Sequence, residues 1–432
     1  MRAAPFFPGQ TMSTAYAVTV DDMSLHFDPA KLTPKQRRDE AESADLMGFL
    51  QVVYIGLGKP ADYVMMYEEF GVAPWPERLA TITEFFKRMG IDPIPPEHRA
   101  LHPKTDFYNS VARNLPPTDS ITLYMTSGTN SVLHNDPEAY RVSQNVNSKI
   151  HFARNAPGFG IPVPETIVLT KGTLDSPLAH GFIAKHGNKV MMKVLGLAGA
   201  RNVTTVTSIQ EAKDYVAEYE DSMELILQQR LDLTRFTEMT VDLRVTPDEI
   251  VIANVRKIMF ADGVWVGNLI GPDVILTEAH KKELLNVGEY ARAQGFVAPE
   301  GINCGIDYFI AGDEVMVTEI NCRWTGGLFP TEMIRKVGAQ NESCVAFVDL
   351  VREDKFDDWL DFIDRHLWTE TKGSFAMVPL GFSPIPQVMG GVNHYLTWQV
   401  VPGDFESFKE VRRRELGDGA LMRADSISLE FS

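Results

Sequence analysis

Two carboxylates and an amide recur at short spacing in the segment Gly301–Pro330, GINCGIDYFIAGDEVMVTEINCRWTGGLFP. This segment reads as two apolar strands joined by a tight turn at residues 311–313, because Gly and Asp adopt turn conformations that other residues resist. Side chains alternate between the faces of a strand, and a loop of odd length places Asp307, Glu319 and Asn321 on one face. Asp307 then lies diagonal to Glu319, about 7–8 Å away, so both carboxylates reach one cation.

Oxygen ligands of this kind suit a hard cation such as Mg²⁺, which typically takes one or two protein carboxylates together with water and substrate phosphates. Arg323 follows Asn321 by two positions, and its planar guanidinium can hold a further anionic oxygen. The alternative is an amphipathic hairpin whose polar face is merely in contact with water. The apolar residues that flank Glu319 and Asn321, and the glycine pair that follows, favour the cation site.

Length and composition limit the class of protein. A chain of 432 residues is too long for one typical domain and predicts two or three. Its net charge of −17 argues against a general nucleic-acid binder, and no segment approaches the roughly 18 apolar residues of a membrane helix. The N-terminus lacks an apolar signal core. The three cysteines show no metal-ligand spacing and are too few for a disulfide framework. We therefore expect a cytoplasmic protein that binds neither membranes nor nucleic acids.

The segments Asp307-Tyr308-Phe309 and Glu319-Ile320-Asn321-Cys322-Arg323 resemble the closing metal-binding motif of the ATP-grasp superfamily. Enzymes of this superfamily typically activate a carboxylate as an acyl phosphate and pass it to an amine or another nucleophile. The resemblance extends over residues 145–340, where several weak motifs follow one another in the order of the family. The biotin-dependent carboxylases share Glu-x-Asn-x-Arg, but this sequence has no Met-Lys-Met biotin attachment segment.

The resemblance implies that two lysines reach the nucleotide phosphates. Lys149 lies in an expected helix, 147–155, that begins with an Asn-Ser cap. Lys193 lies among apolar residues of an expected strand, 189–195, where the burial of its charge requires a partner. A solvated helix lysine is the alternative for Lys149.

A glycine-containing loop follows this strand, and by the resemblance Gly196 and Gly199 would let backbone N–H groups approach phosphate oxygens. The loop has fewer glycines than the family pattern and contains Arg201, so a plain turn is the alternative. It is not a P-loop, which ends in Gly-Lys-Ser/Thr. The resemblance further places adenine against a hinge formed by Gln228, Gln229 and Leu231, and the ribose on Glu238.

The Asp-x-Arg-Val strand and the later Arg256 resemble the branch that includes ribosomal-protein glutamate ligase and glutathione-synthetase-like enzymes. In that branch Arg244 and Arg256 would hold the substrate carboxylate or acyl phosphate, and Asn268 would lie near the phosphates. Arg323 would act with Arg256 to stabilise the transferring phosphoryl group. Exposed strand charges are common, so a solvated sheet face is the alternative for each of these residues.

The expected fold class is α/β, with nucleotide held between two subdomains. We expect an N-terminal α/β domain over 1–145, a small grasp subdomain over 146–235, a large grasp subdomain over 236–352 and a β-rich C-terminal extension over 353–432. Within these parts the patterns also predict helices over 63–70 and 343–352.

Together the motifs predict an ATP-dependent carboxylate–amine ligase that uses ATP and one or two Mg²⁺ ions, with Mn²⁺ as a substitute, and releases ADP and phosphate. Its partners would be small-molecule carboxylates and amines, and the arginines indicate an acidic or amino-acid carboxylate. A monomer and a homodimer both fit the sequence. Phosphotransfer to a hydroxyl or another non-carboxylate acceptor, and an ATP-binding module without chemistry, stay open as alternatives.

Overall fold

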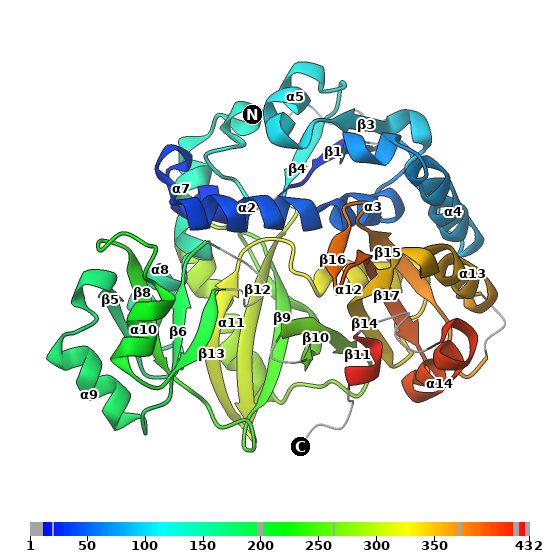
Figure 1. Ribbon diagram of the computed structural model, residues 1–432. Coiled ribbons are helices and arrows are strands. Elements are labelled where there is room, and N and C mark those ends of the chain that lie inside the picture. Colours follow the sequence, from blue (N-terminus) through cyan, green and yellow to red (C-terminus); the bar gives the residue numbers. More distant parts are fainter. Residues whose placement is uncertain are drawn as a thin grey trace.

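The computed structural model describes residues 12–19, 21–196, 202–261, 264–369, 373–417 and 423–427. The predicted site residue Gly199 and its neighbour Arg201 lie outside these residues. Figure 1 shows three sheets, with the N-terminal sheet above the other two. In the described part of the chain, no helix combines the length and the apolar composition that crossing a bilayer requires.

The N-terminal part of the chain forms a four-stranded parallel sheet in the order β3-β2-β1-β4. Its strands are β1 (Thr14–Ala17), β2 (Tyr63–Tyr67), β3 (Arg99–His102) and β4 (Ser120–Leu123), and the main helices around it are α2 (Pro34–Leu46), α3 (Gly48–Leu57), α4 (Trp75–Arg88) and α5 (Phe107–Asn114). The strand order reverses between β1 and β4, and in open α/β sheets ligands bind beyond the carboxyl ends of the strands at such a point. Tyr124, directly after β4, contacts Arg323, so this edge faces the predicted site.

The large sheet has nine strands in the described residues, in the order β13-β12-β9-β10-β11-β14-β17-β15, with β16 paired to β17. Its strands are β9 (Thr237–Val245), β10 (Ile250–Ala261), β11 (Val264–Ile270), β12 (Ile302–Ala311), β13 (Glu314–Asn321), β14 (Cys344–Arg352), β15 (Val378–Phe382), β16 (Gln387–Met389) and β17 (Val392–Pro402). The segment 353–432 therefore extends this sheet with three strands, in agreement with the predicted β-rich extension.

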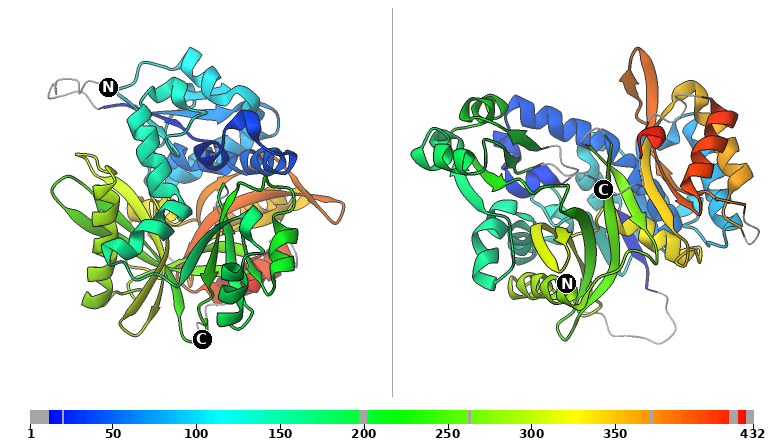
Figure 2. Two further views of the ribbon diagram at one scale, coloured as in Figure 1. Left: turned by 90° about the vertical axis from the view of Figure 1, so that its left-hand side faces the viewer. Right: turned by 90° about the horizontal axis from the view of Figure 1, so that it is seen from below.

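The small sheet is antiparallel, with the order β5-β8-β6-β7. Its strands are β5 (Thr166–Thr170), β6 (Val190–Val194), β7 (Val203–Val206) and β8 (Glu224–Gln229), and the helices α9 (Pro177–Lys185) and α10 (Ile209–Tyr215) pack on it around a core of its own. In Figure 1 the small sheet and its helices stand beside the large sheet, and the side view in Figure 2 shows the N-terminal part above both.

The remaining helices connect these sheets or cover them. They are α1 (Asp22–His26), α6 (Ser131–His134), α7 (Pro137–Asn147), α8 (Lys149–Asn155), α11 (Glu278–Ala293), α12 (Leu328–Lys336), α13 (Phe356–His366) and α14 (Phe405–Leu416). One apolar core includes α11 with the strands β9, β12 and β13, while another joins the N-terminal sheet to β14, β15 and β17 through α3. The N-terminal and C-terminal parts of the chain are therefore packed together as one body.

Two predicted helices are strands. Residues 63–70 form β2 and a short 3₁₀ turn, and β2 pairs with β1 on one side and β3 on the other. In the second run, residues 344–352 form β14, which is buried at every position except Arg352. Both runs are short, apolar and buried on two faces, and the periodicity of such a run does not separate a central strand from a buried helix.

Candidate nucleotide and metal site

The acidic hairpin is built from β12 and β13, and its turn differs from the prediction. Ala311 pairs with Glu314, so the turn contains only Gly312 and Asp313. An even loop would put Asp307 and Glu319 on opposite faces, but a β-bulge at Thr318 adds one residue to β13 and corrects the register. Asp307 therefore lies directly opposite Glu319, and not diagonal to it. The predicted common face is present, for a different reason.

The three predicted metal ligands contact one another. The Asn321 amide donates to Asp307 Oδ2 at 2.9 Å and to Glu319 Oε1 at 3.4 Å. Rotation of this amide by half a turn would present its oxygen at the same place. In the described residues no group of three or more His, Cys, Asp or Glu side chains could hold a metal ion. Two carboxylates and an amide fit a Mg²⁺ ion that takes its remaining oxygens from phosphates and water.

Both predicted lysines reach this hairpin. Lys149, the first residue of α8, places its Nζ 2.9 Å from Glu319 Oε2. Lys193, on β6, is 7% exposed and donates from Nζ to the Thr318 carbonyl oxygen at 3.4 Å. The bulge that corrects the register thus also presents a backbone acceptor to the lysine of the small sheet. The small and large sheets meet at these contacts.

Burial and charge divide the carboxylates of this cluster into protonated and ionised groups. Burial, and then the charge of Glu319, raise the pKa of Asp307 to about 7. Burial alone would also raise the pKa of Glu319, but Lys149 and Lys193 outweigh it and hold that pKa at about 2. Burial and the neighbouring Asp307 raise the pKa of Glu238, on β9, to about 8. The raised pKa values of Asp307 and Glu238 reflect carboxyl groups that are crowded together, and a bound cation would allow both to ionise.

The hinge residues occupy the end of β8. Gln228 is 5% exposed and donates to Thr166 Oγ1 at 3.0 Å. The Gln229 N–H donates to the Glu165 carbonyl oxygen at 2.8 Å, and the Gln229 side-chain oxygen accepts from the Glu165 N–H at 3.3 Å. These groups join β8 to β5, so an adenine at this hinge would have to use other backbone groups, such as those next to Leu231.

Gly196 begins the predicted phosphate loop in a conformation that favours glycine, with φ of +106°. A Cβ at this position would lie 2.6 Å from Met23 Sδ and 2.9 Å from the Phe27 ring. Gly196 itself therefore packs closely against the region of α1.

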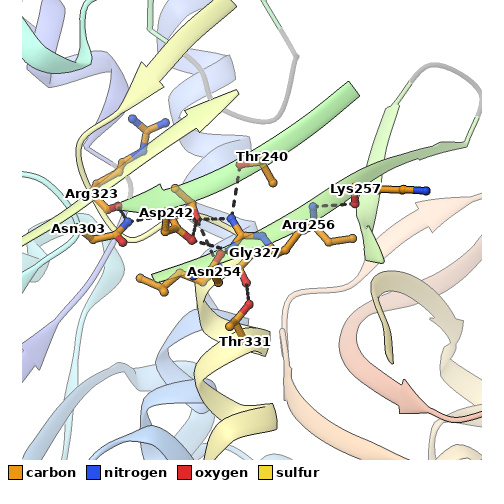
Figure 3. A network of polar contacts seen from close by, with 12 residues as sticks. Thr240, Asp242, Asn254, Arg256, Lys257, Asn303, Arg323, Gly327 and Thr331 are labelled. Carbon is orange, nitrogen blue, oxygen red and sulfur yellow. Dashed lines mark hydrogen bonds and ion pairs between the residues drawn. The ribbon is translucent and has the colours of Figure 1, made fainter. Parts of the chain in front are cut away.

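Arg256 is not available to a substrate. Its side chain and that of its ion-pair partner Asp242 are both 0% exposed. The guanidinium also donates to Asn254 and to Thr240 Oγ1, the latter at 3.4 Å (Figure 3). A Cβ at Gly327 would lie 2.2 Å from Arg256 Nε, so the backbone of the glycine pair covers the guanidinium. The predicted contact between Arg256 and a substrate carboxylate is wrong for this conformation.

Arg244 lies outside the cluster. Its side chain is 50% exposed and pairs with Glu249 Oε1 at 3.0 Å. Strand pairing sets Asp307 opposite Thr240 and sets Arg244 opposite Asn303. Arg244 thus lies four residues along β9 from Thr240, the residue opposite Asp307. This separation is about 13 Å at the usual rise of a strand. The structure thus does not bring Arg244 together with the hairpin residues, and its contact with a substrate stays a prediction.

Arg323 connects the hairpin to the N-terminal part of the chain. Its Nη1 donates to Asn147 Oδ1 at 2.9 Å and its Nε to the Tyr124 hydroxyl at 3.3 Å. Its backbone N–H donates to the Asn321 carbonyl oxygen at 2.9 Å, so it adjoins a predicted metal ligand, and its charge helps to lower the pKa of Glu319. Asn268 is 2% exposed and donates to the Lys257 carbonyl oxygen at 3.4 Å, so its side chain is buried in the sheet.

The sequence prediction missed Tyr124, Asn147 and His26, which come from the N-terminal part of the chain. Burial, Arg323 and Lys149 lower the pKa of His26 to about 4. Tyr124 directly follows β4, so its position at the carboxyl end of a parallel strand was a usable signal. The sequence around Asn147 and His26 gives no comparable signal.

The parallel N-terminal sheet, the small antiparallel sheet and the large sheet together have the architecture of the ATP-grasp fold. No family model and no curated protein sequence matches the chain. Among solved structures, it is similar to the ADP complex of PurK, an N5-carboxyaminoimidazole ribonucleotide synthetase, with 9% identity, a TM-score of 0.57 and coverage of 96% of this chain and 98% of that chain.

Two further solved structures are similar over their whole length. The carboxyaminoimidazole ribonucleotide synthase of Aspergillus clavatus, complexed with ATP, has 13% identity and a TM-score of 0.56, with 97% of this chain and 99% of that chain covered. The phosphoribosylamine–glycine ligase of Thermotoga maritima has 13% identity and a TM-score of 0.53, with 97% and 98% covered. At these identities the similarity shows a shared fold.

Proposed function

We propose that the protein is an ATP-dependent ligase that activates a carboxylate as an acyl phosphate and joins it to an amine. One observation carries this proposal: in an ATP-grasp fold, Asp307, Glu319 and Asn321 of the large sheet meet Lys149 and Lys193 at the junction with the small sheet. The solved structures of similar fold support it, since one is described as complexed with ATP and another with ADP and 5-aminoimidazole ribonucleotide.

In this proposal Asp307, Glu319 and Asn321 hold Mg²⁺, which would neutralise and orient the phosphate oxygens of ATP. Lys149 and Lys193 balance the remaining phosphate charge, and Arg323 stabilises the phosphoryl group during transfer. Glu238 would hold the ribose, and the backbone around Leu231 would hold the adenine. Arg244 and Arg256 receive no substrate role.

The chemistry has two steps. A carboxylate oxygen attacks the terminal phosphorus of ATP, the bond between that phosphorus and the bridging oxygen breaks, and ADP leaves. The amine then attacks the carbonyl carbon of the acyl phosphate, phosphate leaves with its bonding electron pair, and the amine loses a proton. Water would hydrolyse the intermediate, so the site must be shielded from solvent during the reaction.

The domain boundaries at 145, 235 and 352 belong to the same proposal. We propose the cytoplasm as its location, and the three cysteines support a reducing compartment because all are buried and free. Cys304 and Cys322 form no disulfide, although the Cys322 thiol contacts Cys304 Sγ at 3.5 Å.

The direct test supplies the full-length protein with MgATP, hydroxylamine as a general amine, and one small carboxylate at a time. ADP release that depends on the carboxylate, together with formation of a hydroxamate, is the expected result. A carboxylate-dependent release without hydroxamate in the presence of excess hydroxylamine would contradict amide formation. ADP release that depends on a hydroxyl compound and not on any carboxylate would favour a phosphotransferase.

A further inference from the structure

Asn147 is the last residue of α7, and it lies where the N-terminal part of the chain reaches the acidic hairpin. Only Ser148 separates it from Lys149, the first residue of α8. Both neighbours of Ser148 contact residues at the end of the hairpin, since Lys149 pairs with Glu319 and Asn147 contacts Arg323. The proposed function uses Lys149 and Arg323 but gives Asn147 no role.

The amide of Asn147 makes three hydrogen bonds, and they determine its orientation. Its Oδ1 accepts from Arg323 Nη1 at 2.9 Å. Its Nδ2 donates to the carbonyl oxygens of Ser143 at 3.0 Å and Cys322 at 3.3 Å. A guanidinium can only donate and a carbonyl oxygen can only accept, so the amide oxygen must be the end that faces Arg323. The side chain is 6% exposed, so this orientation is held inside the protein.

The main chain of Arg323 is held by its own neighbours in the large sheet. Its N–H donates to the Asn321 carbonyl oxygen at 2.9 Å, and its carbonyl oxygen accepts from Asn303 Nδ2 at 2.7 Å (Figure 3). The long side chain beyond this backbone has many rotamers, and ordering it is costly. The position of the guanidinium therefore depends on the groups that contact it, and Asn147 and Tyr124 contribute two of them from the N-terminal part.

Both of these groups are uncharged. An amide oxygen or a hydroxyl aligns a guanidinium through a hydrogen bond without forming an ion pair. Arg256 differs, because its guanidinium is buried against the carboxylate of Asp242. Asn147 and Tyr124 thus orient the cation of Arg323 and leave its charge to act on an anion such as a phosphoryl oxygen.

We propose that Asn147 is a positioning residue, whose uncharged amide oxygen holds the guanidinium of Arg323 toward the transferring phosphoryl group. This inference rests on the proposed function, in which Arg323 stabilises that group. Asn147 acts through Arg323 and not by contact with a substrate. The two hydrogen bonds from its amide nitrogen join α7 to the strand end that carries Arg323, so the bond to the guanidinium keeps a fixed origin.

A double-mutant cycle separates this role from a purely structural one. The experiment measures ADP release by the full-length protein with MgATP, hydroxylamine and whichever of acetate, glycine, L-glutamate and bicarbonate gives the highest turnover. Asn147→Ala should lower kcat about tenfold and raise the KM for ATP by less than about fivefold, because a misplaced cation stabilises the transition state less. In the Arg323→Gln protein the same substitution should lower kcat by less than about twofold, since no guanidinium is left to position.

Equal losses of kcat in the two backgrounds would overturn the inference, because Asn147 would then act through the fold alone. Asn147→Asp, which keeps the shape of the side chain, completes the same cycle if Asn147→Ala does not fold. It should also lower kcat about tenfold, because a carboxylate forms an ion pair with Arg323 and reduces the charge that acts on the phosphoryl group. Wild-type kcat in folded Asn147→Asp would contradict the need for an uncharged acceptor.

Asn145→Ala is the matched control, because Asn145 lies two positions earlier on α7 and residues i and i+2 of a helix do not share a face. This variant should leave kcat and both KM values unchanged. An effect as large as that of Asn147→Ala would mean that any truncation of α7 disturbs the site, and it would overturn the specific role of Asn147.

Nucleotide binding gives a second readout that does not need turnover. Asn147→Ala should weaken the calorimetric Kd for MgAMP-PNP about threefold to fivefold, and should change it by less than about twofold in the Arg323→Gln protein. MgADP, which lacks the terminal phosphoryl group, should bind all four proteins alike. A wild type that releases no ADP with any carboxylate but shows this coupling would overturn the ligase proposal alone. Carboxylate-dependent turnover with independent losses in both cycles would overturn the role of Asn147 alone.

Discussion

Two polar clusters lie on the same face of the large sheet, and they use similar residues in opposite ways. Strand pairing aligns Glu319, Asp307, Thr240 and Arg256 in one row across β13, β12, β9 and β10. At one end of the row, the carboxylates meet lysines that come from other parts of the chain. At the other end, Arg256 is enclosed with Asp242 and covered by Gly327.

The difference between them is charge balance. In the enclosed cluster one carboxylate faces one guanidinium, hydroxyl groups satisfy further N–H donors, and neither charged side chain is exposed. In the hairpin cluster two neighbouring carboxyl groups have pKa values of about 7 and about 2, so only one of them is readily ionised at neutral pH. A balanced, sealed pair completes the fold by itself, whereas an unbalanced and partly open cluster is suited to bind a cation and its ligands.

The largest expected effect is on turnover. Glu319→Ala should lower ATP consumption about a hundredfold to a thousandfold or more, because it removes both a proposed metal ligand and the partner of Lys149. The folded state should survive, as judged by circular dichroism and thermal unfolding. Glu278→Ala is the control, because its side chain is 89% exposed on α11. Full turnover in Glu319→Ala would remove the basis for treating the hairpin as the active cluster.

The enclosed cluster should instead control stability. Asp242→Ala leaves the guanidinium of Arg256 buried without its carboxylate, which should reduce the free energy of unfolding by about 3–5 kcal/mol. Urea unfolding of Asp242→Ala and Glu319→Ala under the same conditions makes the comparison. The double variant Asp242→Leu with Arg256→Met should recover much of the loss, because no charge is then left unpaired. Equal stability losses in Asp242→Ala and Glu319→Ala would contradict the distinction between the two clusters.

The binding of Mg²⁺ should depend on pH through Asp307. Burial and Glu319 raise the pKa of Asp307 to about 7, so a metal ion has to displace a proton at lower pH. Affinity for Mg²⁺ in the presence of ADP should therefore rise by about tenfold per pH unit between pH 5 and pH 7. Calorimetric titrations at several pH values measure this slope, and Asp307→Asn should flatten it.

The same pKa shift has a consequence for the metal-free protein. Folded Asp307 binds its proton more tightly than unfolded Asp307, so the stability that this proton contributes is present below about pH 4. It is lost as the pH rises toward 7. Asp307→Asn should therefore unfold at higher denaturant concentration than the wild type at pH 8, and at similar concentration at pH 4. The opposite order at pH 8 would mean that folding does not raise the pKa of Asp307.

The sequence could predict the hairpin cluster because its information is local. Asp307, Glu319 and Asn321 belong to two adjacent strands, and period-two alternation places them on a common face. The turn length was nevertheless wrong, and the common face depends on the bulge at Thr318, which no rule of alternation predicts. The local pattern thus predicted which three residues cluster, without the register that brings Asp307 and Glu319 opposite each other.

The sequence could not separate the two clusters because charge balance depends on contacts between distant residues. Arg256 pairs with Asp242 across two strands and is covered by Gly327, which lies 71 positions further along the chain. The alternating pattern of β9 makes Asp242 and Arg244 equally plausible as site residues, although one is 0% and the other 50% exposed. The effect of Arg323 and Lys149 on the pKa of His26 likewise depends on how α1 packs against the small sheet near Gly196.

The smallest expected effect comes from substitution of Arg244. It is also the sharpest check on the comparison of the two clusters, because the sequence predicted that Arg244 holds the substrate carboxylate or acyl phosphate. Its pair with Glu249 is about half exposed, and such pairs contribute about 0–1 kcal/mol. Arg244→Gln should therefore change kcat/KM for each substrate less than about twofold and the free energy of unfolding by less than about 1 kcal/mol.

Arg323→Gln is the matched variant for this test, because it is the same substitution at an arginine of the hairpin cluster. Arg323 contacts Asn147 and Tyr124. It should lower kcat about a hundredfold, since it removes a cation near the transferring phosphoryl group. A large loss of kcat in Arg244→Gln would mean that the far end of β9 moves toward the substrate during turnover. The face of the large sheet would then act as one extended site, and the division into an open and a sealed cluster would hold only for the conformation described here.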